Sequence, residues 1–186
     1  MGMTVLYLEE TYSARKSIID FSERHYQEDR HKFVFVETVT ALDEYIYEME
    51  GYNTYGAIAV DLAVEMSLLP REDIVSRIPL LDRDDVPTKC IDDSAPGNPS
   101  IPLYGLDYFR LVIAKRKETQ QMVSEGRVVL FSGHAAKIRS RGLYNETLAE
   151  FANTQLIDRA ERDATGKLFS MLSTIEESLK LRGVAR

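Results

Sequence analysis

The stretch "YGAIAVDLAV", Tyr55 to Val64, is an apolar run interrupted by a single acid, Asp61. Small and β-branched apolar residues in an unbroken run are typical of a strand that a parallel sheet buries on both faces. A carboxylate at the end of such a strand is costly unless a partner or a metal compensates its charge. Asp61 therefore marks the end of a central strand and is the first candidate for a functional residue.

Similar apolar runs elsewhere in the chain predict further strands, and amphipathic segments between them predict helices. The predicted strands are Thr4–Glu10, Lys32–Thr38, Tyr55–Asp61, Arg127–Gly133 and Thr154–Asp158. Apolar residues at helical spacing predict helices over Tyr12–Gln27, Thr40–Glu50 and Leu111–Gln121, and around the stripe from Leu168 to Leu179. Strands that alternate with helices predict a parallel sheet with helices on both faces.

The composition limits the classes of function. With 186 residues, the chain is expected to form a single domain, 1–186. A net charge of −7 argues against a nucleic-acid-binding surface, because phosphate contacts need clustered Lys and Arg. The single cysteine, Cys90, can form no internal disulfide, and no apolar run reaches the roughly 20 residues of a membrane span. A cytoplasmic protein without membrane contact is expected.

One segment departs from the alternating pattern. All six prolines lie between Pro70 and Pro102, where several aspartates also gather. Proline inside a helix costs about 3 kcal/mol, so this segment is not one continuous helix. An irregular stretch of this length is usually functional or mobile.

Acidic and polar side chains follow the predicted strands. Glu9 and Glu10 end the first strand, Asp61 the third and Ser132 the fourth, and Asp158 and Arg159 end the fifth. Because the carboxyl ends of parallel strands meet at one edge, these side chains are expected to converge. Taken singly, an acid after a strand is usually just the start of a loop, and Asp158 and Arg159 are able to pair with each other.

Converging carboxylates repel one another and raise each other's pKa, and a hard divalent cation removes that penalty. Oxygen ligands in a partly hydrated site suit Mg²⁺, with Glu9, Glu10 and Asp61 as its ligands. Asp61 is then a candidate nucleophile that accepts a phosphoryl group. Ser132 and Arg159 are candidates to bind the phosphoryl oxygens.

This placement resembles the receiver domain of bacterial response regulators. That family carries an acidic pair after the first strand, Asp after the third, Ser or Thr after the fourth and Lys after the fifth. These positions match Glu9–Glu10 in "VLYLEET", Asp61 in "IAVDLAV", Ser132 in "VVLFSGHA" and Arg159 in "LIDRA". The string "IPLYGLDYFRLVIAKR", Ile101 to Arg116, is similar to the opening of the family's third helix but is displaced along the chain.

The resemblance implies a flavodoxin-like, doubly wound α/β fold with three layers and a parallel sheet in the order 2-1-3-4-5. It also implies an insertion at about 63–100, after the acceptor Asp, that controls access and partner choice rather than folding. The chain departs from the family in having two Glu residues in the acidic pair and Arg159 in place of Lys, which keeps the charge but not the shape.

Three functions follow from these residues. The first is a single-domain signalling receiver that accepts a phosphoryl group on Asp61 from a histidine kinase or phosphotransfer protein, with Mg²⁺, and then switches the binding of a downstream partner. Its only enzymatic activity would be self-phosphorylation and autodephosphorylation. The second is a pseudo-receiver that works through protein contact without phosphorylation, which the Glu pair, Arg159 and the insertion favour. The third is a small metal-dependent phosphohydrolase that uses the same acids.

Overall fold

The computed structural model describes residues 2–26, 31–47, 55–64, 76, 78, 90–91, 101–140, 151 and 153–183. Within them, five parallel strands form one sheet in the order β2-β1-β3-β6-β7. These strands are β1 (Thr4–Leu8), β2 (Lys32–Val36), β3 (Ala57–Val60), β6 (Val128–Ser132) and β7 (Gln155–Asp158). In strand sequence this is the order 2-1-3-4-5, so the predicted flavodoxin-like α/β fold is confirmed.

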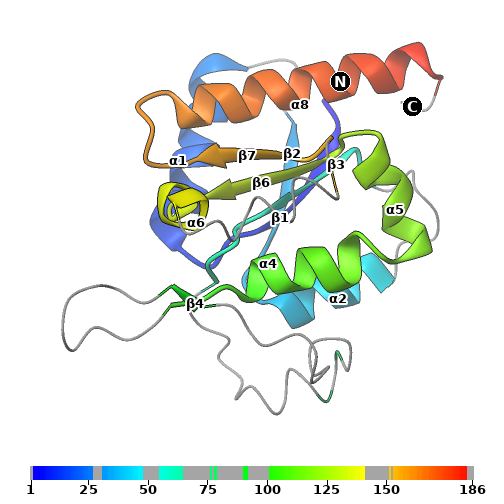
Figure 1. Ribbon diagram of the computed structural model, residues 1–186. Helices are drawn as coiled ribbons and strands as arrows, with labels where there is room; N and C mark the ends of the chain where they lie inside the picture. The colour runs from blue at the N-terminus through cyan, green and yellow to red at the C-terminus, as the bar shows by residue number, and fades with distance from the viewer. Residues whose placement is uncertain are drawn as a thin grey trace.

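Helices cover both faces of the sheet and make the outer two of three layers (Figure 1). Helices α1 (Tyr12–His25) and α8 (Ala164–Leu181) lie on one face, and α2 (Val39–Tyr47) and α4 (Tyr104–Tyr108) lie on the other. The predicted helices over Tyr12–Gln27 and Thr40–Glu50 are therefore present, although residues 27 and 48–50 lie outside the described part of the chain. The stripe from Leu168 to Leu179 belongs to α8.

Alternation along the strands divides the core into two clusters. In β1, Leu6 and Leu8 pack on the α2 and α4 side, whereas Val5 and Tyr7 pack on the α1 and α8 side. Successive strand side chains point to opposite faces, so a strand that is apolar at every position is buried on both. Each fully buried Leu contributes roughly 1.5–3 kcal/mol, and this burial holds the helices on the sheet.

One predicted helix is interrupted. Helix α4 continues as a π-helix, η2 (Phe109–Ile113), and a separate helix, α5 (Lys117–Ser124), begins after a turn. Arg116 at the start of α5 has an extended backbone, with ψ near 137°. The buried Thr119 hydroxyl donates to the carbonyl of Ile113, which satisfies an acceptor that the broken helix leaves without an internal donor. The single helix predicted over Leu111–Gln121 was therefore wrong.

The predicted insertion at 63–100 lies mostly outside the described residues. Its described part includes β4 (Cys90–Ile91), which pairs antiparallel with β5 (Ile101–Pro102) just beyond it. Ala63, Val64 and Ile78 are buried in the core cluster that faces α2 and α4. These three side chains therefore contribute to the core, and folding of the domain without the segment stays a prediction.

Candidate functional site

The sheet brings the predicted site residues to its carboxyl edge. Leu8 lies beside Val60 and Ser132 lies beside Asp158, so the residues that follow β1, β3 and β7 reach the same edge. Main-chain hydrogen bonds extend this order beyond the strands. The N–H of Asp61 donates to the carbonyl of Leu8 at 3.0 Å, and the N–H of Arg159 donates to that of Ser132 at 3.0 Å.

Arg159 joins two carboxylates at this edge. Its Nη1 atom hydrogen-bonds to Oε2 of Glu9 and lies 3.3 Å from Oδ2 of Asp61. Glu9 is fully buried and Asp61 is 3% exposed, whereas the Arg159 side chain is 26% exposed. The guanidinium therefore separates two buried acids from the solvent and compensates their charge.

Every oxygen of the two carboxylates has a donor from the protein. Oε1 of Glu9 accepts from the N–H of Thr11 at 2.9 Å, and Oε2 accepts from the Tyr7 hydroxyl at 3.4 Å as well as from Arg159. Oδ1 of Asp61 accepts from the N–H of Ala63 at 3.1 Å. Because buried carboxylates need this solvation, these donors keep both acids in fixed orientations.

Burial dominates the titration of the site. The pKa of Asp61 is raised to about 7: loss of solvent is the main cause and the neighbouring Glu9 adds to it, while Arg159 and hydrogen bonds from Ser132 and Ala63 oppose the shift. Burial and the two acids raise the pKa of the Tyr7 phenol well above its ordinary value, so this hydroxyl stays a donor. Burial alone would lower the pKa of Arg159, but Asp61 and Glu9 raise it overall.

Two glycines allow the close packing around these side chains. A Cβ atom on Gly105 would lie 1.8 Å from the carbonyl oxygen of Asp61, so only glycine lets α4 approach the end of β3 this closely. A Cβ atom on Gly133 would lie 3.1 Å from Nη2 of Arg159. Gly105 in α4 and Gly133 after β6 thus allow close contacts with Asp61 and Arg159, respectively.

The structure brings Glu9, Asp61, Ser132 and Arg159 together, as the strand ends predicted. Arg159 does not pair with Asp158, the simpler alternative that the sequence allowed. Asp158 instead accepts a hydrogen bond from the N–H of Ala160 at 2.9 Å, while Arg159 turns to the two acids. Glu10 is partly exposed, and its predicted role as a third ligand remains a prediction.

Sequence reasoning missed Tyr7, Thr11 and the structural role of Gly105. Tyr7 was predictable, because strand residues two apart share a face and Tyr7 precedes Glu9 by two positions. The contribution of Thr11 comes from its backbone N–H, for which the residue type gives no signal.

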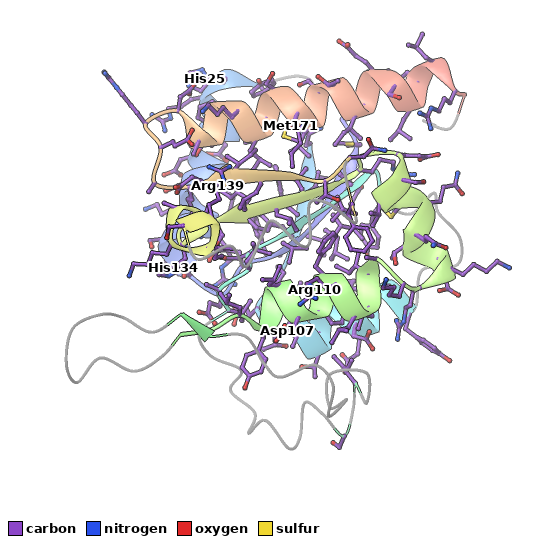
Figure 2. All side chains as sticks on the ribbon, viewed as in Figure 1. His25, Asp107, Arg110, His134, Arg139 and Met171 are labelled. Carbon is purple, nitrogen blue, oxygen red and sulfur yellow. The ribbon has the colours of Figure 1, made fainter. Side chains whose placement is uncertain are left out.

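Two of the three histidines, His25 and His31, belong to an aromatic cluster around Phe169, and His134 lies apart from them. His25 packs against Phe21 with ring centroids 4.5 Å apart, and the N–H of His134 donates to the Ser132 hydroxyl at 3.3 Å. Figure 2 shows His25 beside α8 and His134 beside α6 (Ala135–Ser140). His134 is thus the histidine closest to the candidate site by its contacts.

The described residues do not fit a resident divalent cation in this arrangement. Among them, no group of three or more His, Cys, Asp or Glu side chains is placed to hold a metal ion. Glu9 and Asp61 both direct an oxygen to Arg159, which takes the position between them that a shared cation requires. Mg²⁺ at Glu9, Glu10 and Asp61 remains a prediction that needs Arg159 to move.

Comparison with family models, with curated proteins and with solved structures found no significant match to this chain. Within the described part of the chain, no helix is both long enough and apolar enough to cross a membrane.

Proposed function

We propose that the chain is a receiver-like signalling module that acts by binding a protein partner, without accepting a phosphoryl group on Asp61. One observation carries the proposal: the Arg159 guanidinium contacts both Glu9 and Asp61. It provides internally the positive charge that a phosphorylatable site of this kind would take from a divalent cation. The acids then remain paired without an external ligand.

The state of Asp61 supports the same proposal. A carboxylate nucleophile must be ionised and must reach the incoming phosphorus atom with one oxygen. Burial raises the pKa of Asp61 to about 7, so part of the population is protonated at neutral pH. Its two oxygens face the N–H of Ala63 and Nη1 of Arg159, and the residue is 3% exposed.

Incubation with acetyl phosphate and Mg²⁺ tests the proposal. We expect the wild type to incorporate no more phosphate than Asp61→Asn, which is close in shape but has no carboxylate nucleophile. Addition of beryllium fluoride with Mg²⁺ should shift the melting temperature no further than Mg²⁺ alone. Acid- and base-labile phosphate in the wild type, absent from Asp61→Asn, would reject the proposal.

That outcome would establish the second candidate, a receiver phosphorylated on Asp61 by a histidine kinase or phosphotransfer protein. The hydrogen bond between Ser132 and Asp61 favours it, because a hydroxyl beside the acceptor is suited to bind a phosphoryl oxygen. In this candidate Arg159 has to release Asp61 before the carboxylate can react. Both candidates place the protein in the cytoplasm, which the lone Cys90 favours.

A further inference from the structure

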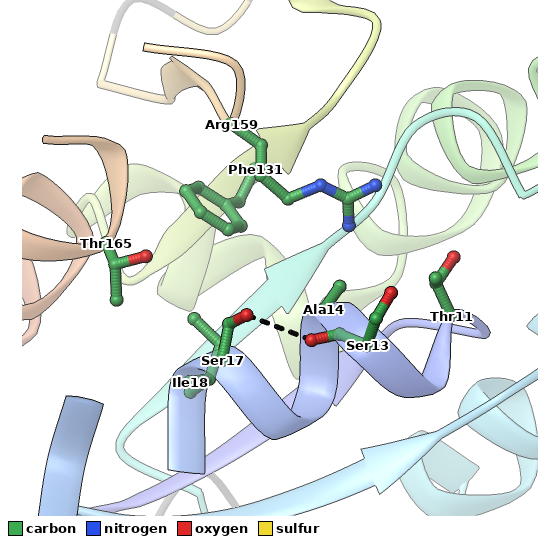
Figure 3. Close-up of a pocket in the computed structure, with 8 residues that line it drawn as sticks. All are labelled: Thr11, Ser13, Ala14, Ser17, Ile18, Phe131, Arg159 and Thr165. Atoms are coloured by element: carbon green, nitrogen blue, oxygen red, sulfur yellow. Dashed lines mark hydrogen bonds between the residues drawn. The ribbon is translucent and has the colours of Figure 1, made fainter. Parts of the chain in front are cut away.

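A cavity opens beside the acid pair, on the face of the sheet that carries α1 and α8. Its volume is about 300 Å³. Figure 3 shows the Arg159 guanidinium extended over the start of α1, with the Phe131 ring beside the Arg159 side chain, on the side toward Thr165 of α8. The remaining wall is formed by small residues and hydroxyls of α1 together with Ile18: Thr11, Ser13, Ala14 and Ser17. The cavity is thus distinct from the carboxylate side of Arg159.

The lining combines one positive charge with hydroxyls and an apolar floor. Among the described residues, Arg159 is the only charged side chain that lines the cavity. Glu9 and Asp61 do not line it, because they are buried behind the guanidinium and contact its Nη1 atom. Arginine has five N–H donors, so contacts at one nitrogen leave donors for a second anionic group.

The hydroxyls add donors around this charge. The Ser17 hydroxyl donates to the carbonyl of Ser13 at 3.0 Å, as drawn in Figure 3. Thr165 stands opposite at the start of α8, and α1 has no acidic residue in its first turn that would repel an anion. Ile18 and Phe131 form the apolar part of the lining and are each 1% exposed, so an apolar group would contact only a small part of each side chain.

We propose that this cavity binds a small molecule that carries an oxyanion, of the phosphate or phosphonate type, on an apolar group. The oxyanion contacts Arg159 and the hydroxyl of Thr165, and the apolar group lies against Ile18 and Phe131. Because Glu9, together with Asp61 when it is ionised, already balances the charge of Arg159, the affinity is modest and weakens with salt. The inference does not rest on the proposed function, since the cavity and its lining are the same whether or not Asp61 reacts.

Phenylphosphonate is the probe that tests it, because its P–C bond prevents transfer of the phosphorus group to Asp61. A titration followed by ¹⁵N–¹H NMR should shift the amide signals of Ser13, Ala14 and Thr165 and the side-chain signal of Arg159, with millimolar affinity. Phenol, which lacks the oxyanion, should bind at least tenfold more weakly. Inorganic phosphate should bind more weakly than phenylphosphonate, since it lacks the apolar group.

Two variants locate the binding. Ala14→Leu fills the cavity from α1 and should weaken phenylphosphonate binding by more than tenfold. Thr165→Val removes one hydroxyl at constant shape and should weaken it about fivefold, as expected for one lost hydrogen bond. Thr174→Val, the same change at an exposed position of α8 outside the cavity, should leave binding unchanged.

Three outcomes overturn the inference: no shifts at these amides, equal binding of phenol and phenylphosphonate, or equal effects of Thr165→Val and Thr174→Val. The Thr165 and Thr174 pair decides the matter if Ala14→Leu fails to fold. None of these outcomes bears on phosphate incorporation at Asp61, so the inference and the proposed function fail independently.

Discussion

Arg127 and Arg159 lie at opposite edges of the central sheet, and their guanidinium groups contact different kinds of acceptor. Arg127 precedes β6 at the amino edge and is almost fully buried. Its Nε and Nη2 atoms donate to the carbonyls of Gly56 and Tyr55, each at 2.7 Å, and its Nη1 lies 3.2 Å from Oε2 of Glu125. These contacts tie the start of β6 to the start of β3.

Arg159 at the carboxyl edge contacts side chains in place of main-chain carbonyls. Its partners Glu9 and Asp61 are both buried acids, and the pKa of Asp61 lies at about 7. A carbonyl acceptor does not titrate, whereas a carboxylate gains and loses a proton. Arg127 also pairs with Glu125, whose pKa partial burial alone would raise but hydrogen bonds from Gln121 and Arg127 lower overall. The contacts of the amino edge therefore stay the same between pH 5 and pH 8, whereas the carboxyl edge holds a charge balance that changes near neutrality. This difference favours the carboxyl edge as the candidate functional edge.

The largest expected effect comes from removing each arginine in turn. Arg159→Met should lower the free energy of unfolding by about 3–5 kcal/mol at pH 8, because it leaves two buried acids without their cation. Arg127→Met should cost about 1–3 kcal/mol, the range for buried acceptors that lose their donors. Urea unfolding measures both values. A larger loss for Arg127→Met than for Arg159→Met would contradict the comparison.

The two arginine variants should also differ in their response to pH. At pH 5 Asp61 takes up a proton, so the loss in Arg159→Met should shrink, while the loss in Arg127→Met should stay constant. Arg159→Lys serves as the matched control, since it keeps the charge and should recover part of the stability. If Arg159→Met lost the same free energy of unfolding at both pH values, Asp61 would not be the group whose charge Arg159 compensates.

Gly105→Ala tests the close approach of α4 to the same edge. The added Cβ would lie 1.8 Å from the carbonyl oxygen of Asp61, and backbone atoms must shift to accept it. We expect a loss of about 2–3 kcal/mol, in the range for overpacked sites. Gly166→Ala in α8 is the control, because its Cβ would meet only the side chain of Asp163, and alanine favours a helix by about 1 kcal/mol. Equal stability of the two variants in urea unfolding would count against this contact.

Asp61→Asn should stabilise the protein at pH 8 and flatten its dependence on pH. The pKa of Asp61 is raised from 3.8 to about 7 in the folded state. Between these values the folded chain keeps a proton that the unfolded chain has lost, so stability falls as the pH rises to about 7 and is constant above it. A shift of about three units corresponds to roughly 4 kcal/mol.

The amide of Asn accepts less well from Arg159, which offsets part of this gain, and we expect a net stabilisation of about 2 kcal/mol at pH 8. The measurement is the free energy of unfolding of both proteins at pH 5 and pH 8. The wild type should lose stability over this interval and Asp61→Asn should not. A wild type that gains stability from pH 5 to pH 8 would mean that Asp61 is ionised throughout.

Much of this edge was predictable because a parallel sheet converts sequence order into spatial order. The apolar runs predicted all five strands, and their ends placed Glu9, Asp61, Ser132 and Arg159 together. The partner of each side chain was not predictable, since strand ends fix positions only to several ångströms. In addition, either a metal ion or a guanidinium can compensate the negative charge of the carboxylates. The sequence therefore favoured Mg²⁺ where the structure has Arg159 between the acids.

The prediction of one helix over Leu111–Gln121 was wrong for a different reason. Lys115, Lys117, Glu118 and Gln120 are good helix formers, so local propensity predicts no interruption at Arg116. The break is set by a tertiary contact, the hydrogen bond from the buried Thr119 to Ile113, which local sequence does not encode. Ile78 shows the same limit, because a proline-rich segment gives no local sign that one of its side chains enters the core.

The smallest effect is expected for Tyr7→Phe, which removes the hydroxyl of Tyr7 and keeps its ring. The ring packs against Phe35 and Phe131, with centroids 5.5 and 6.3 Å away, and Tyr7→Phe preserves this packing. The lost hydrogen bond to Glu9 is long, at 3.4 Å, and Glu9 keeps its donors Arg159 and Thr11. We expect a loss of about 1 kcal/mol in urea unfolding.

Tyr108→Phe is the matched control for Tyr7→Phe, because the hydroxyl of Tyr108 also donates to a carboxylate, that of Asp43, at 2.7 Å on the opposite face of the sheet. Neither hydroxyl contacts Asp61 directly, so both variants should keep the fall in stability between pH 5 and pH 8 that Asp61→Asn removes. If Tyr7→Phe removed that fall as well, the titrating unit would include Glu9 and Tyr7 in addition to Asp61. The charge balance at the carboxyl edge would then belong to the whole hydrogen-bonded group, with Arg159 at its centre.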